Sequence, residues 1–406
     1  MKFPIHLNFR ALFLGAIIGL QLHCAASDVD KQEGAIRVEI PRFEEMVDQD
    51  WFTNLHYVPL CTGDAAVQVH ELAKIRYHDD HLYVLSIDQG IERQLFKFTL
   101  DGELLAKLPN ANDRRLKSGR IEDILIANDT LHVIDSGRGA IYRYDTDLQF
   151  VDMVSYPDTL SVKNLGYHPN SGAYAFRTSE PYGTVSPVYI AEDVRQTNLA
   201  VADELGAYTD NAAANFPFMF FENFATYEED LLYHDLFSSD IWGYDGDLFV
   251  QAYSLDFADQ LFISNEELHQ FPPGEVERQF EMIQRSGKAI NLDQIGQIGD
   301  NLYVTFGDPK KYYLVIFDER GSVLRHAYVP MLSKQRNTID SGPDLDFPLG
   351  VLNNSIVFVQ DIETIELYGE NNSYATTKTS NIRDILELDD TSCNKVLVFA
   401  TLKAMD

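Results

Sequence analysis

The amino-acid sequence predicts an all-β fold, a six-bladed β-propeller with a short helical insertion between blades four and five. Three observations predict it: a unit of short β runs recurs six times, its hairpin turns carry Asp and Gly, and one helical stretch interrupts the series. No such unit could bury its apolar residues alone, whereas blades around a central channel bury them against each other. Two long β-sandwiches or a solenoid are the alternatives, although a solenoid would repeat at shorter and more regular intervals.

The repeated unit consists of a β run, a turn, a second β run that ends in an aromatic residue and Asp, and a turn into a third run. Its clearest copy is residues 131–150, which contain Leu-His-Val-Ile-Asp-Ser-Gly-Arg and Ile-Tyr-Arg-Tyr-Asp. The other copies occupy residues 81–104, 173–193, 231–246, 302–321 and 355–400. The hairpin aspartates recur about every 44 to 52 residues except across the insertion, and they are Asp101, Asp145, Asp193, Asp245 and Asp318.

The insertion lies in the wide interval before the fifth of these aspartates. Residues 264–267 read Ser-Asn-Glu-Glu, which is a helix-start pattern, and Pro272-Pro273-Gly274 interrupts it. In residues 275–285, Val276, Phe280 and Ile283 fall on one helical face before Gly287. One or two helices are therefore expected to decorate an otherwise β chain.

Composition describes a globular and strongly acidic protein. The 406 residues include 25 Phe and 21 Tyr, ample material for a core, and 32 Lys and Arg stand against 63 Asp and Glu. A net charge of -31 argues against nucleic-acid binding, which depends on Lys and Arg displacing counterions. It also repels anionic lipids, so we expect contact with a membrane only through a covalent lipid anchor.

The amino terminus has the pattern of an export signal. Residues 1–23 contain Lys2, Arg10 and an apolar run over 11–22, which is shorter than the roughly 20 residues that span a bilayer. A true transmembrane anchor is the alternative. Cys24 follows in a degenerate lipobox whose departure is His23, so we expect lipidation at Cys24, with cleavage near Ala26 to a soluble form as the alternative. The predicted location is the bacterial periplasm, the outer membrane or the cell surface.

Two segments of the second predicted blade, and one segment of the last predicted strand, resemble known sequences. Residues 133–138 and 141–145 resemble an NHL-like blade, and Asn-Lys-Val-Leu-Val at 394–398 resembles the final strand of the six-bladed β-propeller lipoproteins of Bacteroidetes. The resemblance covers residues 51–404. It departs at residues 110–120, where that family often has a Gly-Pro-Gly-Glu turn. It implies an exported, often membrane-tethered protein that commonly has no assigned activity, with residues 24–50 as a linker and N-terminal edge and 51–406 as the propeller.

The resemblance also implies how the ring closes. Such propellers usually pair an N-terminal strand with the last blade, in this chain residues 57–60 antiparallel to 395–401, which brings Cys61 toward Cys393. Disulfides persist in exported proteins, so we expect a bond that stabilises the fold by about 4 to 5 kcal/mol in the chain-entropy model. Two buried thiols are the alternative, and thiol titration of the denatured, unreduced protein distinguishes them.

Candidate ligand-binding residues lie in the loops that gather at one mouth of the channel. These loops join second to third strands and blade to blade, and loops on a rigid scaffold commonly carry function. Their basic residues are Arg114, Arg115, Lys117, Arg120, Arg138, Lys310 and Lys311. They predict a positive mouth for an acidic sugar or a peptide carboxylate. The alternative is solvated loop charge with Asp113, Asp135 and Asp308 as local partners. The aromatic residues at 216–221 could stack on sugars, but such a run is more often a buried strand edge.

Catalytic and metal signals are weak. The sequence has no His-x-His, His-Glu-x-x-His, Gly-x-Ser-x-Gly or Walker pattern, and the three-residue spacing of His78 and His81 fits a polar turn better than a metal pair. The leading hypothesis is a monomeric, non-catalytic propeller without cofactor that binds a carbohydrate, a peptide or an envelope protein. The second is a metal-dependent hydrolase, lactonase or lyase with Ca²⁺ in the central channel, and the third is a structural interaction module without a small ligand.

Overall fold

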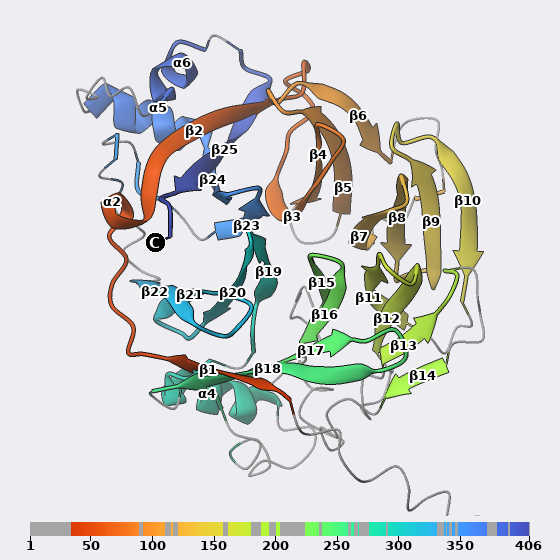
Figure 1. Ribbon diagram of the computed structural model, residues 1–406. Helices are drawn as coiled ribbons and strands as arrows, with labels where there is room; N and C mark the ends of the chain where they lie inside the picture. The colour runs from red at the N-terminus through yellow and green to blue at the C-terminus, as the bar shows by residue number, and fades with distance from the viewer. Residues whose placement is uncertain are drawn as a thin grey trace, which may run out of the picture.

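In the computed structural model, six β-sheets stand as blades around a common axis (Figure 1). The innermost strands of consecutive blades contact one another, and those of the last and first blades do so too, so the ring is closed. The predicted six-bladed propeller is confirmed. The structure describes residues 34–88, 92–109, 115–116, 121–156, 161–179, 188–194, 200–203, 224–234, 238–258, 261–263, 267, 276–289, 291–330, 337, 339–340, 343–345, 348–371, 380–388 and 390–405.

Blades one to three each contain four antiparallel strands, which follow one another from the channel outward. Blade one contains β3 (Glu71–His78), β4 (His81–Asp88), β5 (Glu92–Thr99) and β6 (Leu104–Leu108). Blade two contains β7 (Ile121–Ala127), β8 (Thr130–Asp135), β9 (Ala140–Asp145) and β10 (Phe150–Ser155). Blade three contains β11 (Ser161–His168), β12 (Ala173–Ser179), β13 (Val188–Ala191) and β14 (Ala200–Asp203).

Blades four and six use strands from the N-terminal segment. Blade four contains β15 (Phe224–Tyr227), β16 (Asp230–His234), β17 (Asp240–Tyr244) and β18 (Phe249–Phe257), and β1 (Ile36–Ile40) runs parallel to β18 at its outer edge. Blade five contains β19 (Gln294–Ile298), β20 (Asn301–Gly307), β21 (Lys311–Phe317) and β22 (Val323–Pro330). Blade six contains β23 (Pro348–Leu352), β24 (Ser355–Asp361), β25 (Cys393–Leu402) and, outermost, β2 (Phe52–Cys61).

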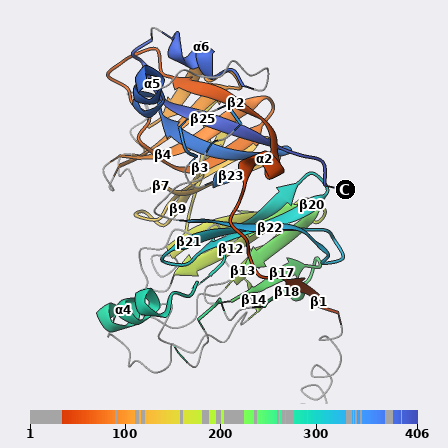
Figure 2. The ribbon, with the colours of Figure 1, turned by 90° about the vertical axis from the view of Figure 1, so that its left-hand side faces the viewer.

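Four helices interrupt the strands in the described part of the chain. The helix α4 (Val276–Ser286) lies between β18 and β19, which confirms the insertion between blades four and five. The short α2 (Asp48–Trp51) precedes β2, while α5 (Ile362–Asn371) and α6 (Ile382–Leu386) lie between β24 and β25 and were not predicted. Figure 2 shows α4 and α5 on one side of the ring and the C-terminus on the other. None of the described helices is long and apolar enough to cross a bilayer.

The core is divided into six apolar clusters, one at each interface between neighbouring blades. Between blades one and two, for example, the rings of Tyr83, Tyr142 and Tyr144 are at most 1% exposed. Burying a large apolar side chain contributes about 1.5 to 3 kcal/mol. Because every cluster takes residues from two blades, each blade depends on both neighbours for its stability.

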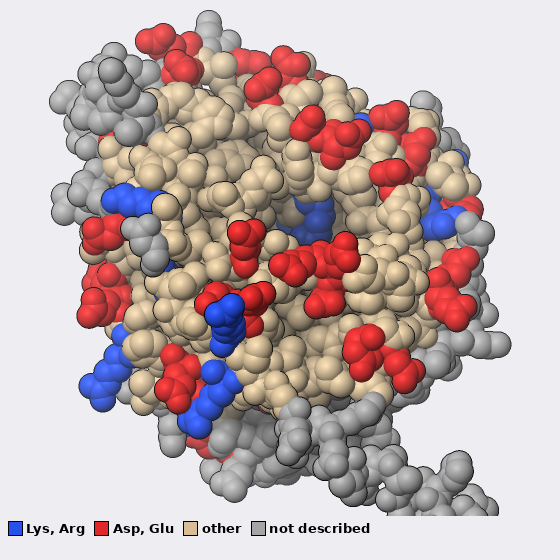
Figure 3. All heavy atoms as spheres, viewed as in Figure 1, with Lys and Arg blue, Asp and Glu red and all other residues tan. Residues whose placement is uncertain are grey.

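Acidic residues form tight turns between the inner strands. Asp79 and Asp80 have φ of 48° and 59°, and Asn128 and Asp129 have φ of 50° and 53°. A two-residue hairpin of the I′ type needs positive φ at both central positions, which Asn and Asp tolerate better than other side chains. Turn geometry therefore accounts for part of the acidic composition. Figure 3 shows Asp and Glu gathered around the central hollow, with Lys and Arg deeper inside it.

The ring closes through β2 and β25. Tyr57 pairs with Val398 and Leu60 with Lys395, so the antiparallel closure expected from the resemblance is confirmed. The N-terminal segment reaches β2 by crossing three blades: β1 lies on blade four, and Glu45 then forms a parallel bridge to Tyr328 of blade five (Figure 1). Part of residues 24–50, the segment expected as a linker and N-terminal edge, therefore runs along the outer edges of blades four and five.

Gly102 permits the closing strand to pass over blade one. Its φ is +86°, and a Cβ at this position would lie 1.9 Å from the backbone oxygen of Pro59. The amide N–H of Cys61 donates to the oxygen of Gly102 at 2.9 Å. Only glycine combines a left-handed backbone with so close an approach.

Candidate binding site at the channel mouth

The inner strands are irregular where they begin. The strand register shifts between Leu72 and Lys74 in β3, and comparable shifts occur in three other inner strands, at Ile121/Asp123, Val162/Asn164 and Pro348/Gly350. A β-bulge adds one residue and re-aims the side chains beside it. The bulges therefore re-aim the polar side chains that lie beside them near the start of these inner strands.

Asp123 connects the first three blades. Its carboxylate forms an ion pair with Lys74 of blade one and accepts a hydrogen bond from the amide N–H of Leu165 of blade three at 3.3 Å. The side-chain amide of Asn164 lies 3.5 Å from the same oxygen. Asp123 is only 2% exposed, and a buried carboxylate is tolerated when donors satisfy it in this way. The carboxylate therefore fixes three inner strands relative to each other.

Glu122 gathers a second set of donors beside it. Ser136 donates to its carboxylate at 2.9 Å, Lys163 of blade three at 3.3 Å, and the Arg93 guanidinium lies 3.8 Å away. Arg93 also donates to the backbone oxygen of Ile121 at 2.6 Å. Burial lowers the pKa of Arg93, and the charges of Glu122 and Asp123 oppose that effect. Glu122 and Asp123, at the start of β7, therefore lie in a network of cations and carboxylates that links blades one, two and three.

Blade five contributes a different carboxyl group. Burial raises the pKa of Asp293 to about 7, which a hydrogen bond from the side-chain amide of Asn291 at 3.3 Å partly opposes. Burial and the nearby charge of Asp293 raise the pKa of Tyr312, whose hydroxyl donates to Thr305 at 2.9 Å. Asp293 is thus a carboxyl group that can exchange a proton near neutral pH.

A cavity of about 1110 Å³ lies between blade six and blade one. The start of β3, the end of β24, the first turns of α5 and the turn before β25 form it. Its charged lining is Glu71, Asp361, Glu363, Glu366, Asp390 and Lys395. Val69, Leu349 and Leu388 add apolar surface, and Lys395 forms an ion pair with Asp361. The remaining carboxylates make the cavity an acceptor of hydrogen bonds.

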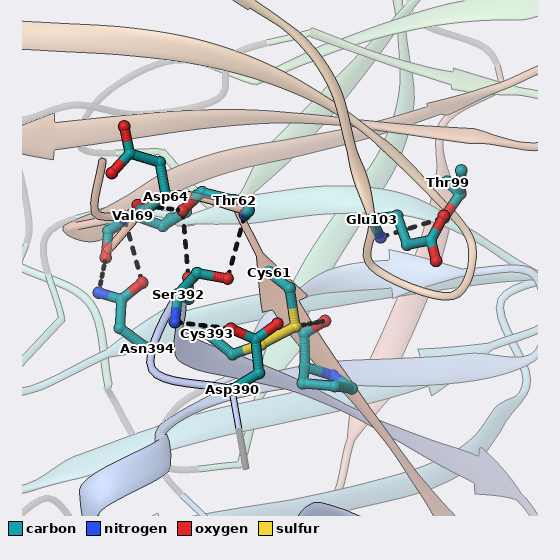
Figure 4. The surroundings of a disulfide bond; sticks show 12 residues. Cys61, Thr62, Asp64, Val69, Thr99, Glu103, Asp390, Ser392, Cys393 and Asn394 are labelled. Atoms are coloured by element: carbon teal, nitrogen blue, oxygen red, sulfur yellow. Dashed lines mark hydrogen bonds between the residues drawn. A yellow bond between two sulfur atoms is a disulfide. The ribbon is translucent and has the colours of Figure 1, made fainter. Parts of the chain in front are cut away.

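Hydrogen bonds from both ends of the propeller hold one wall of the cavity (Figure 4). Asn394 accepts from the amide of Val69 at 3.1 Å and donates to its carbonyl at 2.6 Å. Thr62 donates to the carbonyl of Ser392 at 3.1 Å, and the amide of Ser392 donates to Asp390 at 2.9 Å. A site whose groups are held in place before binding loses less entropy when a ligand arrives.

A disulfide joins Cys61 and Cys393 in this wall, at a Cα–Cα distance of 4.0 Å. The two cysteines are also the last register pair between β2 and β25. With the Asp390 carboxylate they form a group whose potential ligand atoms lie within 4.8 Å of one another, and among the described residues no other such group of three or more exists. His78 and His81, the other metal candidates, face each other across the β3–β4 turn, where His78 lies 3.1 Å from Asp129.

Of the predicted basic loop residues, the structure describes Arg115, Arg138, Lys310 and Lys311. Arg138 donates to the backbone oxygen of Arg115 at 2.7 Å, and the Arg115 guanidinium lies 3.7 Å from the ring centroid of Phe150 in the outer strand of blade two. Lys311 lies 3.7 Å from the ring centroid of Tyr328 in the outer strand of blade five. The structure thus brings Arg115 and Arg138 together, but Lys310 and Lys311 belong to a blade three positions away.

Other predicted features lie outside the described residues: the signal segment 1–23, Cys24, Arg114, Lys117, Arg120 and the aromatic run at 216–221.

Sequence reasoning missed the polar residues of the inner strands, although a signal was present. Residues 72–75, 121–124, 162–165 and 292–295 read Leu-Ala-Lys-Ile, Ile-Glu-Asp-Ile, Val-Lys-Asn-Leu and Leu-Asp-Gln-Ile. Each of these four-residue segments begins and ends with an apolar residue. At least one of the two residues between them is polar. Aligning the six repeats at their inner strands would have exposed this recurring position.

Comparisons with known proteins identify the fold. A family model described as 6-bladed beta-propeller matches residues 30–340. A solved structure of a Bacteroides fragilis protein thought to be exported has 14% identity and a TM-score of 0.65, and the match covers 91% of this chain and 100% of that one. A protein from Bacteroides vulgatus has 9% identity and a TM-score of 0.47, covering 87% of this chain and 97% of that one. No curated protein matches the chain.

Proposed function

The chain belongs to this family of six-bladed β-propellers, and we propose that it is an exported, lipid-anchored, non-catalytic propeller that binds a carbohydrate, a peptide or an envelope protein at the mouth of its channel. The observation that carries the proposal is the cavity of about 1110 Å³ between blades six and one. Ligand sites are typically concave, about 300 to 1,000 Å³ in volume, and combine apolar surface with a few polar groups. At about 1110 Å³ the cavity lies slightly above the upper end of that range, and its lining has that mixture of apolar and polar groups.

The lining favours ligands that donate hydrogen bonds. Sugar hydroxyls, peptide amides and ammonium groups can donate to Glu71, Glu363 and Glu366, while the apolar faces of a sugar ring or side chain can pack on Val69 and Leu388. An anionic ligand would meet repulsion from these carboxylates. The positive mouth expected from Arg114, Arg115, Lys117, Arg120, Arg138, Lys310 and Lys311 stays a prediction, for a separate part of the rim.

A thermal-shift screen over neutral sugars, acidic glycans and peptides tests the proposal, because binding to the native state raises its melting temperature. For a ligand that gives a shift, Leu388→Trp should reduce it, because the larger ring narrows the cavity and replaces the apolar surface of Leu388. The control Glu281→Gln removes an exposed carboxylate on α4 and should leave the shift unchanged. A panel without any shift, or undiminished binding by Leu388→Trp, would contradict the proposed site.

Lipid anchoring is tested separately. Wild-type protein expressed in a bacterium with a lipoprotein pathway should partition into detergent and carry acyl mass at its N-terminus, whereas Cys24→Ser should remain in the aqueous phase. Equal partitioning of the two proteins would contradict the anchor and leave the binding site untouched.

A metal-dependent hydrolase, lactonase or lyase is the second candidate, and Asp293 favours it. A carboxyl group with pKa of about 7, placed directly before the innermost strand of blade five, could serve as a general acid or base at neutral pH. Lactone hydrolysis assayed with and without Ca²⁺ tests this candidate. Activity lost in Asp293→Asn but kept in the control Asp300→Asn would support it, and inactivity of the wild-type protein on all substrates would count against it.

A further inference from the structure

The Cys61–Cys393 disulfide, which joins the two strands that close the ring, lies beside the carboxylate of Asp390, a group that can bind a metal ion. The Asp390 carboxylate lies within 4.8 Å of both sulfur atoms, and the amide of Ser392 orients it at 2.9 Å. The oxidised sulfurs cannot act as thiolate ligands, so in this form the group holds no metal site. Reduction changes the chemistry of two of its three members without requiring a change in the surrounding sheet.

Strand pairing keeps the two cysteines together after reduction. Leu55, Tyr57 and Leu60 of β2 each pair with a residue of β25 in the antiparallel sheet. The Cα atoms of the two cysteines lie only 4.0 Å apart. A tetrahedral zinc site with Zn–S bonds of about 2.3 Å separates its sulfurs by about 3.8 Å. Two thiolates that no longer share a bond can adopt that separation by side-chain rotation, because their backbones are already adjacent.

Asp390 is placed to provide the third ligand. With a Zn–O bond of about 2.1 Å, a carboxylate oxygen in the same tetrahedron lies about 3.6 Å from each sulfur. The present separation of up to 4.8 Å therefore needs to close by about 1 Å. Asp390 and Cys393 both line the cavity, so an ion can enter there and a water molecule can occupy the fourth position.

We propose that reduction of the Cys61–Cys393 disulfide creates a site in which the two thiolates and the Asp390 carboxylate bind one thiophilic divalent cation, such as Zn²⁺. A dithiol reductant supplies two electrons and two protons, the S–S bond breaks, two thiols form, and the reductant becomes a disulfide. Binding of the cation releases both thiol protons to water as two metal–sulfur bonds form. In this proposal β2 and β25 are joined either by the disulfide, in the oxidised protein, or by the bound metal ion, in the reduced protein.

Cobalt binding to the full mature chain tests this directly, because thiolate ligation of Co²⁺ gives a near-ultraviolet charge-transfer band and strong visible bands when four-coordinate. After reduction with a phosphine and its removal without oxygen, the protein should bind one equivalent of Co²⁺, which Zn²⁺ displaces. Oxidised protein should show neither band. Cys61→Ser should lose most of the charge-transfer intensity, and Asp390→Asn should weaken binding by at least about tenfold.

The matched control is Glu363→Gln, which removes a carboxylate from the same cavity but not from the proposed ligand set and should bind Co²⁺ like wild type. Folded reduced protein without a thiolate band would overturn the proposal, as would equal affinity of Asp390→Asn and wild type. If reduction itself unfolds the chain, added Zn²⁺ should restore the β-sheet circular dichroism of wild type but not of Cys61→Ser. Failure to restore it would equally overturn the proposal.

Discussion

His132 should make the stability of this propeller decline in mild acid. Its ring is fully buried between blades two and three, packs 5.3 Å from the ring of Tyr174, and has Nδ1 3.1 Å from the oxygen of Thr130. Burial, followed by the positive charge of Arg143, lowers the pKa of His132 to about 4. The neutral ring fits this interface and the imidazolium does not.

The magnitude follows from proton linkage. An unfolded histidine has a pKa of about 6.5, so between pH 6.5 and pH 4 the unfolded chain holds a proton that the folded chain lacks. The contribution of His132 to stability therefore falls as the pH drops through this window and stops falling below pH 4, where both states carry the proton. At about 1.4 kcal/mol for each pKa unit, the total loss is about 3 kcal/mol, most of it complete by pH 4.5.

The assay compares the wild-type protein with His132→Phe, which keeps an aromatic ring against Tyr174 but cannot be protonated. Urea unfolding, followed by the fluorescence of Trp51 and Trp242, should show the stability difference between the two proteins change by more than about 2 kcal/mol from pH 7 to pH 4.5. His56→Phe, at an exposed position on β2, is the control and should follow the wild-type profile. Parallel profiles of wild type and His132→Phe would refute the reasoning.

Three further predictions concern the ring closure. Gly102→Ala should lower the unfolding free energy by more than about 2 kcal/mol in urea titrations, because its Cβ would meet the oxygen of Pro59 in a left-handed backbone; a neutral effect would contradict this contact. Arg325→Leu should lower it by about 2 to 3 kcal/mol, because its guanidinium donates to carbonyls of both the N-terminal and C-terminal segments; the control Arg320→Leu, at an exposed position, should change little. Cys61→Ser should lower the melting temperature and show one free thiol at Cys393 when denatured, whereas two free thiols in unreduced wild-type protein would exclude the bond.

The architecture could be predicted because its signals are local and repeated. The hairpin aspartates, the alternating apolar runs and the helical face in residues 275–285 each depend on a few neighbouring residues, and six copies reinforce one another. The helices α5 and α6 escaped notice because they lie inside the last repeat, where strands at both ends suggested an uninterrupted blade. A search for repeats therefore finds the strands that all blades share, but it does not find helices that occur in a single blade.

The candidate site could not be predicted in the same way, because it depends on contacts between distant segments. The positive charge of Arg115 suggested a ligand, yet its guanidinium packs on Phe150, and its neighbour Arg138 binds a backbone oxygen. The cavity lining joins residues 68–72, 87, 348–349, 359–363 and 366 to residues 388, 390–391 and 393–395. No spacing rule in a single sequence shows that these segments meet around one space.

The position of the cavity links ligand binding to the integrity of the ring. Residues 68–72 follow the closing strand β2, and residues 390–395 lead into β25, so these two walls are continuous in sequence with the two strands that close the ring. Any change that separates β2 from β25 also separates the groups that would contact a ligand. By reciprocity, a ligand that bridges both walls stabilises the closure by as much as closure improves its affinity. The bond between Cys61 and Cys393 therefore supports the proposed site through the wall that it holds in place, although the ligand need not touch it.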